Sequence, residues 1–273
     1  MKKRYIVITG TTSGIGKELL KLYSANKNNI IFAGFRNNKR CEIHGKNIKY
    51  FYINLNDRKS IVSAAYFIKS RTNRIDKLIN VAGSVTAGPI ELIDTQLLRE
   101  QFDANAFGHL EFTQNLMDIL EDSKIINISS MASFGHFPFI SPYCASKRAM
   151  DILFNALAIE NHNNIKVISI KPGVISTPIW LKSIESNEAL LKNAKGYSKE
   201  MKYLKSNALK NADKGLDVEK VAKFVMKVAA KDNPKSSYTI GYDAKFAELL
   251  SYLPQDLVNY LVKLVFKIRM LKR

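Results

Sequence analysis

A tyrosine and a lysine four positions apart, Tyr143 and Lys147, form the pair of side chains best suited to proton transfer. If the segment is helical, residues i and i+4 share one face, so the phenol and the ammonium point toward the same site. The pKa of a free tyrosine is about 10, which is too high for a base at neutral pH. An ammonium group within about 4–6 Å favours the phenolate and lowers that pKa. The spacing therefore predicts a phenol that exchanges a proton with its ligand, although an isolated pair of this kind more often lies on a surface.

A serine hydroxyl is expected beside this pair. Ser130 follows the β-branched run Lys124–Ser129 and precedes Tyr143 by thirteen residues. Open α/β sheets bind their ligands at the carboxyl ends of parallel strands. If the run is such a strand, the hydroxyl can hydrogen-bond a carbonyl or alcohol oxygen next to the phenol.

Three glycines, Gly10, Gly14 and Gly16, follow the first apolar run and precede a helical pattern. Glycines there let the backbone approach a pyrophosphate, whose charge then lies on the N–H groups that open the helix. The pattern predicts a dinucleotide site, with an ordinary glycine turn as the alternative. The second apolar run ends at Arg36, where an acid would hold the ribose hydroxyls of NAD. A guanidinium pairs with a 2′-phosphate instead, which favours NADP over NAD unless Arg36 is simply solvated.

Seven short apolar runs alternate with longer helical patterns along the chain. Nearly continuous apolarity is typical of strands covered on both faces, and parallel neighbours need crossover helices. The sequence therefore predicts an α/β fold, a Rossmann-type doubly wound parallel sheet in a single domain at 1–242. Residues 182–214 are expected to form a helical lid over the substrate, and 243–273 a helical, amphipathic C-terminal extension. The predicted strands are Arg4–Thr9, Asn29–Gly34, Ile48–Ile53, Lys77–Asn80, Lys124–Ser129, Ile165–Ile170 and Ser237–Gly241, and the predicted helices include Gly16–Asn26, Asp57–Ser70, Gln96–Leu120 and Ser141–Glu160.

Taken together, the motifs resemble the short-chain dehydrogenase/reductase family over about residues 3–241. They are Thr9–Gly16 (TGTTSGIG), Asn80–Gly83 (NVAG), Ala104–Gly108 (ANAFG), Asn127–Ser130 (NISS), Tyr143–Lys147 (YCASK) and Lys171–Thr177 (KPGVIST). The resemblance implies hydride transfer with a nicotinamide cofactor. It also implies that Tyr143 is the general acid or base and that Lys147 binds the nicotinamide ribose as well. Ser130 would orient the reacting oxygen, and Asn105 would organise a proton-relay water.

The resemblance further implies which residues hold the cofactor. They are Gly10, Ser13, Gly14, Ile15, Gly16, Arg36, Asn54, Leu55, Asn80, Ala82, Gly83, Tyr143, Lys147, Pro172, Gly173, Ile175 and Thr177. Two positions depart from the family pattern. Asn54 stands where an aspartate is usual, which weakens the expected bond to the adenine amino group, and Val81 replaces the second asparagine of NNAG. Cys41 and Cys144 lie far apart, so no metal site or disulfide framework is expected.

The expected substrate wall is apolar and contains His136, Phe137 and Trp180 beside Ser130. A pocket for a lipophilic ligand and an ordinary core fit this composition equally well. The stretches at 241–246 and 250–254 are similar to the retinol and hydroxysteroid dehydrogenase branch of the family. The predicted function is NADP(H)-dependent interconversion of an alcohol and a ketone or aldehyde on a retinoid-, steroid- or acyl-like substrate. The alternatives are a 3-oxoacyl carrier-protein reductase and a non-catalytic, membrane-associated protein that binds the cofactor.

The net charge of +18, from 42 basic and 24 acidic residues, favours an acidic partner. No motif supports nucleic-acid binding, which is not expected. Residues 257–273 carry five cations, no acid and an apolar face, so they predict a helix on an anionic membrane surface. The alternative is a helix docked on its own subunit or at a dimer interface. The chain lacks a membrane-spanning run and is expected to be cytoplasmic, with peripheral membrane association. The resemblance implies a homo-oligomer, either a dimer or a tetramer.

Overall fold

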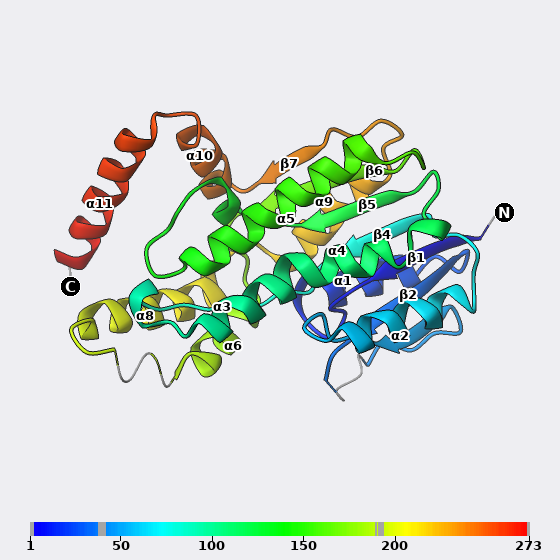
Figure 1. Ribbon diagram of the computed structural model, residues 1–273, viewed down its shortest axis with the longest axis horizontal. Coiled ribbons are helices and arrows are strands. Elements are labelled where there is room, and N and C mark those ends of the chain that lie inside the picture. The colour runs from blue at the N-terminus through cyan, green and yellow to red at the C-terminus, as the bar shows by residue number, and fades with distance from the viewer. Residues whose placement is uncertain (1–2, 38–41, 189, 191–193, 272–273) are drawn as a thin grey trace.

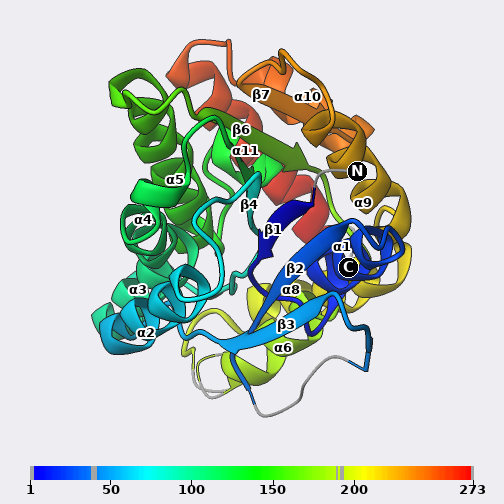
Figure 2. The same ribbon diagram turned by 90° about the vertical axis from the view of Figure 1, so that its right-hand side faces the viewer.

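A single parallel sheet forms the centre of the protein. The computed structural model describes residues 3–37, 42–188, 190 and 194–271. Within these residues, seven strands pair in the order β3-β2-β1-β4-β5-β6-β7, and every pairing is parallel. Helices cover both faces of the sheet, as Figure 1 and Figure 2 show. The fold is therefore the predicted Rossmann-type doubly wound sheet.

The strands lie where the apolar runs predict them, within two residues at either end. They are β1 (Arg4–Ile8), β2 (Asn29–Phe35), β3 (Ile48–Tyr52), β4 (Lys77–Asn80), β5 (Lys124–Ile128), β6 (Lys166–Pro172) and β7 (Ser237–Ile240). The helices are α1 (Gly14–Ser24), α2 (Arg58–Lys69), α3 (Thr95–Phe102), α4 (Gly108–Gln114), α5 (Ser141–Glu160), α6 (Ile179–Ser186), α8 (Ser198–Lys214), α9 (Val218–Ala229), α10 (Tyr242–Leu250) and α11 (Gln255–Leu271). Short helical turns lie at η1 (Ile90–Leu92), η2 (Asp103–Phe107), η3 (Met117–Ile119) and η4 (Met131–Phe134).

Two apolar cores lie on opposite faces of the sheet, because successive side chains of a strand point to opposite faces. In β1, Ile6 and Ile8 belong to the core with α1 and α9, whereas Val7 belongs to the core with α2, α4 and α5. Figure 2 shows these two sets of helices on either side of the sheet. Burial on both faces explains why the strands are nearly continuous in apolar residues.

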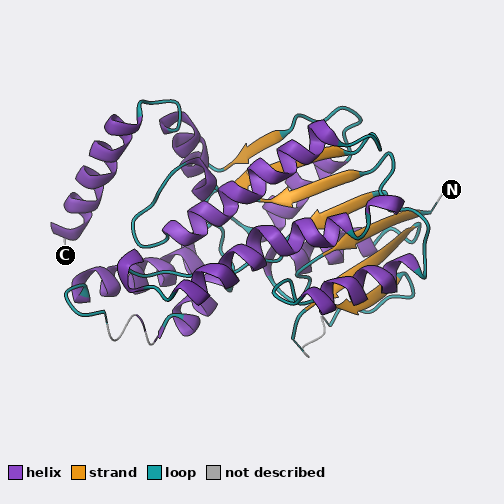
Figure 3. Ribbon diagram, in the orientation of Figure 1, coloured by secondary structure: helices purple, strands orange, loops and turns teal. Residues whose placement is uncertain are grey.

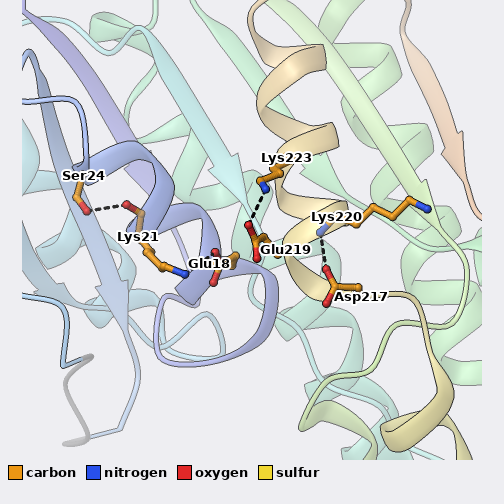
Figure 4. Close-up of polar contacts among 7 residues, drawn as sticks. All are labelled: Glu18, Lys21, Ser24, Asp217, Glu219, Lys220 and Lys223. Atoms are coloured by element: carbon orange, nitrogen blue, oxygen red, sulfur yellow. Dashed lines mark hydrogen bonds and ion pairs between the residues drawn. The ribbon is translucent and has the colours of Figure 1, made fainter.

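Helix boundaries follow local capping. Asp217 accepts a hydrogen bond from the Lys220 amide at the start of α9, so its carboxylate satisfies one of the free N–H groups there. Figure 4 shows this cap where α9 runs beside α1. The same view shows the Glu219–Lys223 ion pair of α9. Asp57 caps α2 in the same way.

The helix predicted at Gln96–Leu120 forms, but it contains a π-turn and ends at Gln114. The chain forms α3, the π-turn η2, α4 and then η3. At Gly108 the helix touches the backbone of Leu55, because a Cβ atom there would lie 2.2 Å from the Leu55 carbonyl oxygen. The wider π-turn directly before it carries Asn105, which is completely buried. The π-turn thus lies where the helix packs closely on a neighbouring loop and turns Asn105 into the interior.

The remaining helices gather beyond the carboxyl ends of the strands. In Figure 3 all the strand arrows point toward the side on which Figure 1 places α6, α8, α10 and α11. None of the described helices is long and apolar enough to cross a bilayer.

Candidate active site

The glycine loop after β1 makes a tight cradle at the start of α1. Gly10 and Gly14 have φ values of +69° and +54°, which lie in the left-handed region. A Cβ atom on Gly16 would lie 2.2 Å from the Gly10 carbonyl oxygen, so only glycine fits there. The first turn of α1 has no acidic residue, and its free N–H groups can bind an anion. These residues fit a dinucleotide pyrophosphate.

Hydrogen bonds fasten this loop to its neighbours. The Thr9 hydroxyl accepts from the amides of Val81 and Ala82, and the Thr11 hydroxyl donates to the Gly34 carbonyl. The loop is thereby tied to the carboxyl ends of both β4 and β2. The backbone is held in place before any ligand binds, which reduces the entropy lost on binding.

The other expected cofactor residues surround this loop. Thr177, in the segment after β6, lies against Gly14, with its Cγ2 atom 3.3 Å from where a Cβ atom would be. Asn80 donates to Asn127 at 2.8 Å across β4 and β5. Arg36 is exposed directly after β2. The remaining members lie along the same edge: Ser13 and Ile15 in the glycine loop and α1, Leu55 and Asn54 after β3, Gly83 after β4, and Pro172, Gly173 and Ile175 at the end of β6 and beyond.

Asn54 and Val81 occupy the two positions where the sequence departs from the family pattern. The Asn54 side chain accepts a hydrogen bond from the Asn56 amide at 3.2 Å, so it closes a short turn after β3. Its backbone amide donates to the Ser60 hydroxyl. The Val81 backbone amide donates to the Thr9 hydroxyl. Both substitutions therefore leave the loops of the candidate site closed by hydrogen bonds.

Tyr143, Ser130 and Lys147 meet at the carboxyl end of β5. Tyr143 and Lys147 lie on one face in the first turns of α5, as the spacing predicts. Ser130 caps η4 by accepting from the Ala132 amide, and its own hydroxyl bonds the Tyr143 phenol. The Lys147 ammonium is buried and donates to the Ile128 carbonyl at 2.8 Å.

The predicted lowering of the Tyr143 pKa is wrong for this structure. Burial raises the pKa of Tyr143 to about 12, and the hydrogen bond from Ser130 opposes that rise only in part. Burial also lowers the pKa of Lys147 to about 8, while the Asp151 carboxylate opposes this change. Loss of hydration by both groups therefore outweighs the attraction that their spacing suggests. The phenol is protonated at neutral pH and is ready to donate.

Asn105 is locked into the wall beside these residues. Its amide nitrogen donates to the Ser84 carbonyl and the Ser146 hydroxyl, both at 3.0 Å, and its oxygen accepts from the Ser84 amide at 2.9 Å. A Cβ atom on Gly83 would lie 3.0 Å from the Asn105 oxygen and 3.5 Å from the Lys147 nitrogen. Asn105 therefore positions the segment after β4 next to Lys147. The relay water that the resemblance implies stays a prediction.

A cavity of about 900 Å³ opens onto Tyr143 and Ser130. His136, Phe137 and Trp180, the expected substrate residues, all line it. The C-terminal helix contributes a further wall that consists of apolar side chains, namely Val258, Leu261, Val262, Val265 and Phe266. The cavity is thus predominantly apolar away from the catalytic edge.

Comparison with known proteins decides the family. Residues 4–188, more than half of the chain, match the family model described as short chain dehydrogenase. This chain is a short-chain dehydrogenase/reductase. It is therefore an oxidoreductase that uses a nicotinamide cofactor, as the motifs predicted.

Several relatives of this dehydrogenase have named activities. It is 28% identical to the 3-ketodihydrosphingosine reductase of Bacteroides thetaiotaomicron over 98% of this chain and 100% of that protein. It is also 28% identical to the NADPH-dependent 3-dehydrocapnine reductase of Ornithobacterium rhinotracheale over 93% of each chain. A short-chain dehydrogenase from Streptomyces avermitilis has the same fold, with a TM-score of 0.75 at 20% identity over 98% of this chain and 97% of that chain.

Sequence analysis missed several polar residues of this dehydrogenase. Asp151 lies four residues after Lys147 and forms a buried ion pair with Lys171 at 3.1 Å. The spacing of four could have indicated Asp151, whereas nothing local marks Lys171 as its partner. His109 is fully buried and bonds the Ala82 carbonyl at 2.9 Å, and burial lowers its pKa to about 3. The His109 ring is therefore neutral near pH 7.

Lys182 is another residue that sequence analysis did not place. It lies on α6, and its ammonium donates to the Ser13 hydroxyl at 3.5 Å. A cation from the helices beyond the sheet thus reaches the loop that fits a pyrophosphate.

Proposed function

We propose that this dehydrogenase reduces the carbonyl group of a lipophilic, long-chain ketone with NADPH. The observation that carries the proposal is the cavity that starts at Tyr143 and Ser130 and continues between α8 and α11 along apolar side chains. An apolar passage of this volume suits a hydrocarbon tail. The two reductases named for 3-ketodihydrosphingosine and 3-dehydrocapnine support the same substrate class.

The proposed roles of the catalytic residues follow from their protonation states. When bound, the reduced nicotinamide supplies a hydride to the carbonyl carbon. The Tyr143 phenol donates its proton to the carbonyl oxygen, which takes the electron pair of the C=O bond and becomes a hydroxyl. Ser130 donates a hydrogen bond to the same oxygen. With its pKa raised to about 12, the Tyr143 phenol is protonated at neutral pH, which is the form that reduction requires.

Lys147 is proposed to bind the nicotinamide ribose and to return a proton toward Tyr143. Its ammonium lies between the Ile128 carbonyl and the segment at Gly83. A pKa lowered to about 8 lets it exchange protons close to neutral pH.

Arg36 is proposed to select NADP by pairing with the 2′-phosphate. The guanidinium is exposed at the sheet edge directly after β2, where the resemblance places the adenosine ribose. Arg36→Asp should raise the dissociation constant of NADP⁺ at least about tenfold and leave that of NAD⁺ nearly unchanged, because an acid repels the phosphate. An unchanged ratio of the two constants would show that Arg36 plays no part in selection.

Oxidation of NADPH against a panel of carbonyl compounds tests the proposed substrate class. The panel contains 3-ketodihydrosphingosine, a retinal, an oxosteroid, a long-chain aldehyde and a 3-oxoacyl thioester. We expect the highest kcat/KM with the long-chain ketone. Preference for the thioester would favour a 3-oxoacyl carrier-protein reductase, and failure with every compound would refute the proposal.

A membrane surface is proposed as the source of this substrate. α11 packs on its own subunit along the cavity, yet its other side remains open to solvent. Exposed apolar side chains continue from α10 onto it: Tyr242, Phe246, Leu249, Tyr252, Leu253, Leu257, Tyr260 and Leu264. Exposed lysines at 263 and 267 supply positive charge beside them. This combination suits anionic lipids.

Co-sedimentation with vesicles tests this surface without opening the cavity. Tyr260→Ser with Leu264→Ser should reduce binding to phosphatidylglycerol-containing vesicles, and purely zwitterionic vesicles should bind the unaltered protein less. Equal sedimentation of the altered and unaltered proteins would refute the membrane proposal. If the altered protein instead changes its oligomer size, this face would be a contact with a second copy of the chain.

We also propose that the chain forms a homo-oligomer. Ile152 and Ile159 are exposed on the outer side of α5, seven residues apart and therefore on one face, and Phe107 is exposed nearby on η2. Light scattering after size exclusion should give a mass of two or four chains, and Ile152→Glu should reduce it.

A further inference from the structure

The cavity changes character along α8, which forms one of its walls. At the C-terminal end of this helix, the Ser176 hydroxyl donates to the Ala212 carbonyl, so that end is held beside the segment following β6. The N-terminal half packs on α11, where the rings of Tyr203 and Phe266 lie 6.1 Å apart and perpendicular. The cavity lining along α8 therefore runs from the segment after β6 to an aromatic, apolar end at Tyr203 and Phe266.

Two asparagines lie on this wall in the C-terminal half of α8, whose end Ser176 holds beside the segment after β6. Asn207 and Asn211 are four residues apart, share one face of α8, and both line the cavity. Both are half-buried, and neither side-chain amide forms a hydrogen bond with any other described residue. An amide that lines a largely apolar cavity is stabilised only when water or a ligand satisfies its hydrogen-bonding groups.

Among the other polar residues that line the cavity, Asp243 and Ser130 already form hydrogen bonds within the protein. The Asp243 carboxylate accepts from the amides of Val174 and Ala244, at 2.7 and 2.9 Å. Ser130 is bonded to the Tyr143 phenol. The two amides line the same cavity as Tyr143 and Ser130, and neither bonds another described residue, so both can meet polar groups of a bound ligand.

We propose that Asn207 and Asn211 form a polar subsite for amino or hydroxyl groups on the carbon atoms next to the reacting carbonyl. The hydrocarbon tail then runs toward Phe266. An amide both donates and accepts, so it can pair with either group. The subsite rests on the proposed reduction of a long-chain ketone. 3-Ketodihydrosphingosine, the compound that one relative is named for, combines such polar groups with a long tail.

A pair of matched ketones tests the subsite by binding. Both carry the same saturated tail, but only one has an amino group and a hydroxymethyl group beside the carbonyl. Trp180 is the single tryptophan of the chain and lines the cavity, so its fluorescence reports binding to the NADP⁺-loaded protein. Asn207→Leu and Asn211→Leu nearly preserve side-chain size while removing the hydrogen-bonding groups.

Each leucine variant should raise the dissociation constant of the polar ketone about fivefold to tenfold and change that of the plain ketone less than about twofold. Lys202→Leu, on the exposed side of the same helix, is the control and should leave both constants unchanged. Equal effects on the two ketones, or no effect on the polar one, would overturn the subsite. Circular dichroism of Asn211→Ala and the unaltered protein shows whether loss of this side chain disturbs folding.

The same samples separate the subsite from the proposed reaction. NADPH oxidation is measured with both ketones in parallel with binding. Selective loss of polar-ketone binding without turnover would support the subsite and refute the proposed reduction. If both ketones are reduced but the leucine variants weaken the binding of both equally, the result would support the proposed reduction and refute the subsite.

Discussion

The catalytic edge of the sheet and the helices beyond it are built in different ways. At the edge, Asn105, His109 and Lys147 are at most 4% exposed, and each hydrogen-bonds a residue from another element. In α8, by contrast, Met201 is the buried side chain, and the ring contact with α11 joins the half-buried Tyr203 and Phe266. A buried polar network holds one geometry, because any shift leaves a group unsatisfied. Apolar contacts between half-exposed helices can rearrange at little cost, so we expect substitutions in this region to change substrate preference more readily than the chemistry at the edge.

Two tyrosines give the strongest test of this difference. Tyr143→Phe removes the proposed proton donor and should lower kcat by about 10³-fold or more, since general acid catalysis contributes about 10²–10⁴-fold. The dissociation constant of NADPH should stay the same, as followed by its fluorescence. Tyr203→Phe, in α8, should retain kcat. Retained turnover in Tyr143→Phe would refute the proposed mechanism.

Substitution of two histidines, one at the buried edge and one at the cavity, compares how the free energy of unfolding depends on acid pH. Burial holds the pKa of His109 at about 3, so the unfolded chain takes up a proton near pH 6.5 that the folded chain cannot. Stability from this group is complete above pH 6.5 and is lost as the pH falls. Between pH 7 and pH 5, urea unfolding of the unaltered protein should lose about 2 kcal/mol more than that of His109→Gln.

His136→Gln is the matched control for this measurement. His136 is exposed at the cavity, whereas His109 is fully buried, so the two variants remove the same ring from opposite environments. Parallel losses in all three proteins would show that His109 does not contribute to acid sensitivity.

Two phenylalanines separate the stability of the fold from binding of the substrate. Phe266→Ala should weaken binding of a long-tailed ketone about tenfold, because it removes apolar contact area, and should cost less than about 1 kcal/mol in unfolding free energy. Phe154 of α5 is 0% exposed and lies in the apolar core, and Phe154→Ala should cost about 3–5 kcal/mol. Binding isotherms and urea titrations check both. A large stability loss in Phe266→Ala would place α11 within the rigid core.

Substitution of Lys182 should have the smallest effect. This residue belongs to the outer helices, but its ammonium reaches Ser13 in the glycine loop, so it tests the contact between the two regions. Lys182→Met should raise the dissociation constants of NADP⁺ and NAD⁺ by a similar factor of about three, because the pyrophosphate is common to both. The effect should fade as salt is added. Lys202→Met should have no effect. A change confined to NADP⁺ would instead assign Lys182 to the 2′-phosphate.

The strands and the main motifs could be predicted from sequence because they depend on local order. The central strands β2, β5 and β6 are apolar runs that are mostly buried. Tyr143 and Lys147 share a face through helical spacing alone. The glycines also act locally, since Gly10 and Gly14 adopt positive φ values that other residues avoid. For such features the neighbouring residues determine the conformation.

Tertiary structure alone decided the electrostatics and the role of the outer helices. The pKa of Tyr143 is raised, against the local prediction, because burial by distant segments removes water from the phenol. The π-turn at Asn105 depends on Ser84 and Ser146, which are separated from it by 21 and 41 residues. The amphipathic pattern of α11 could not distinguish a membrane from a cavity wall, because both remove an apolar face from water. Only contacts between segments far apart in the chain show that one face of this helix lines the cavity and another is left exposed.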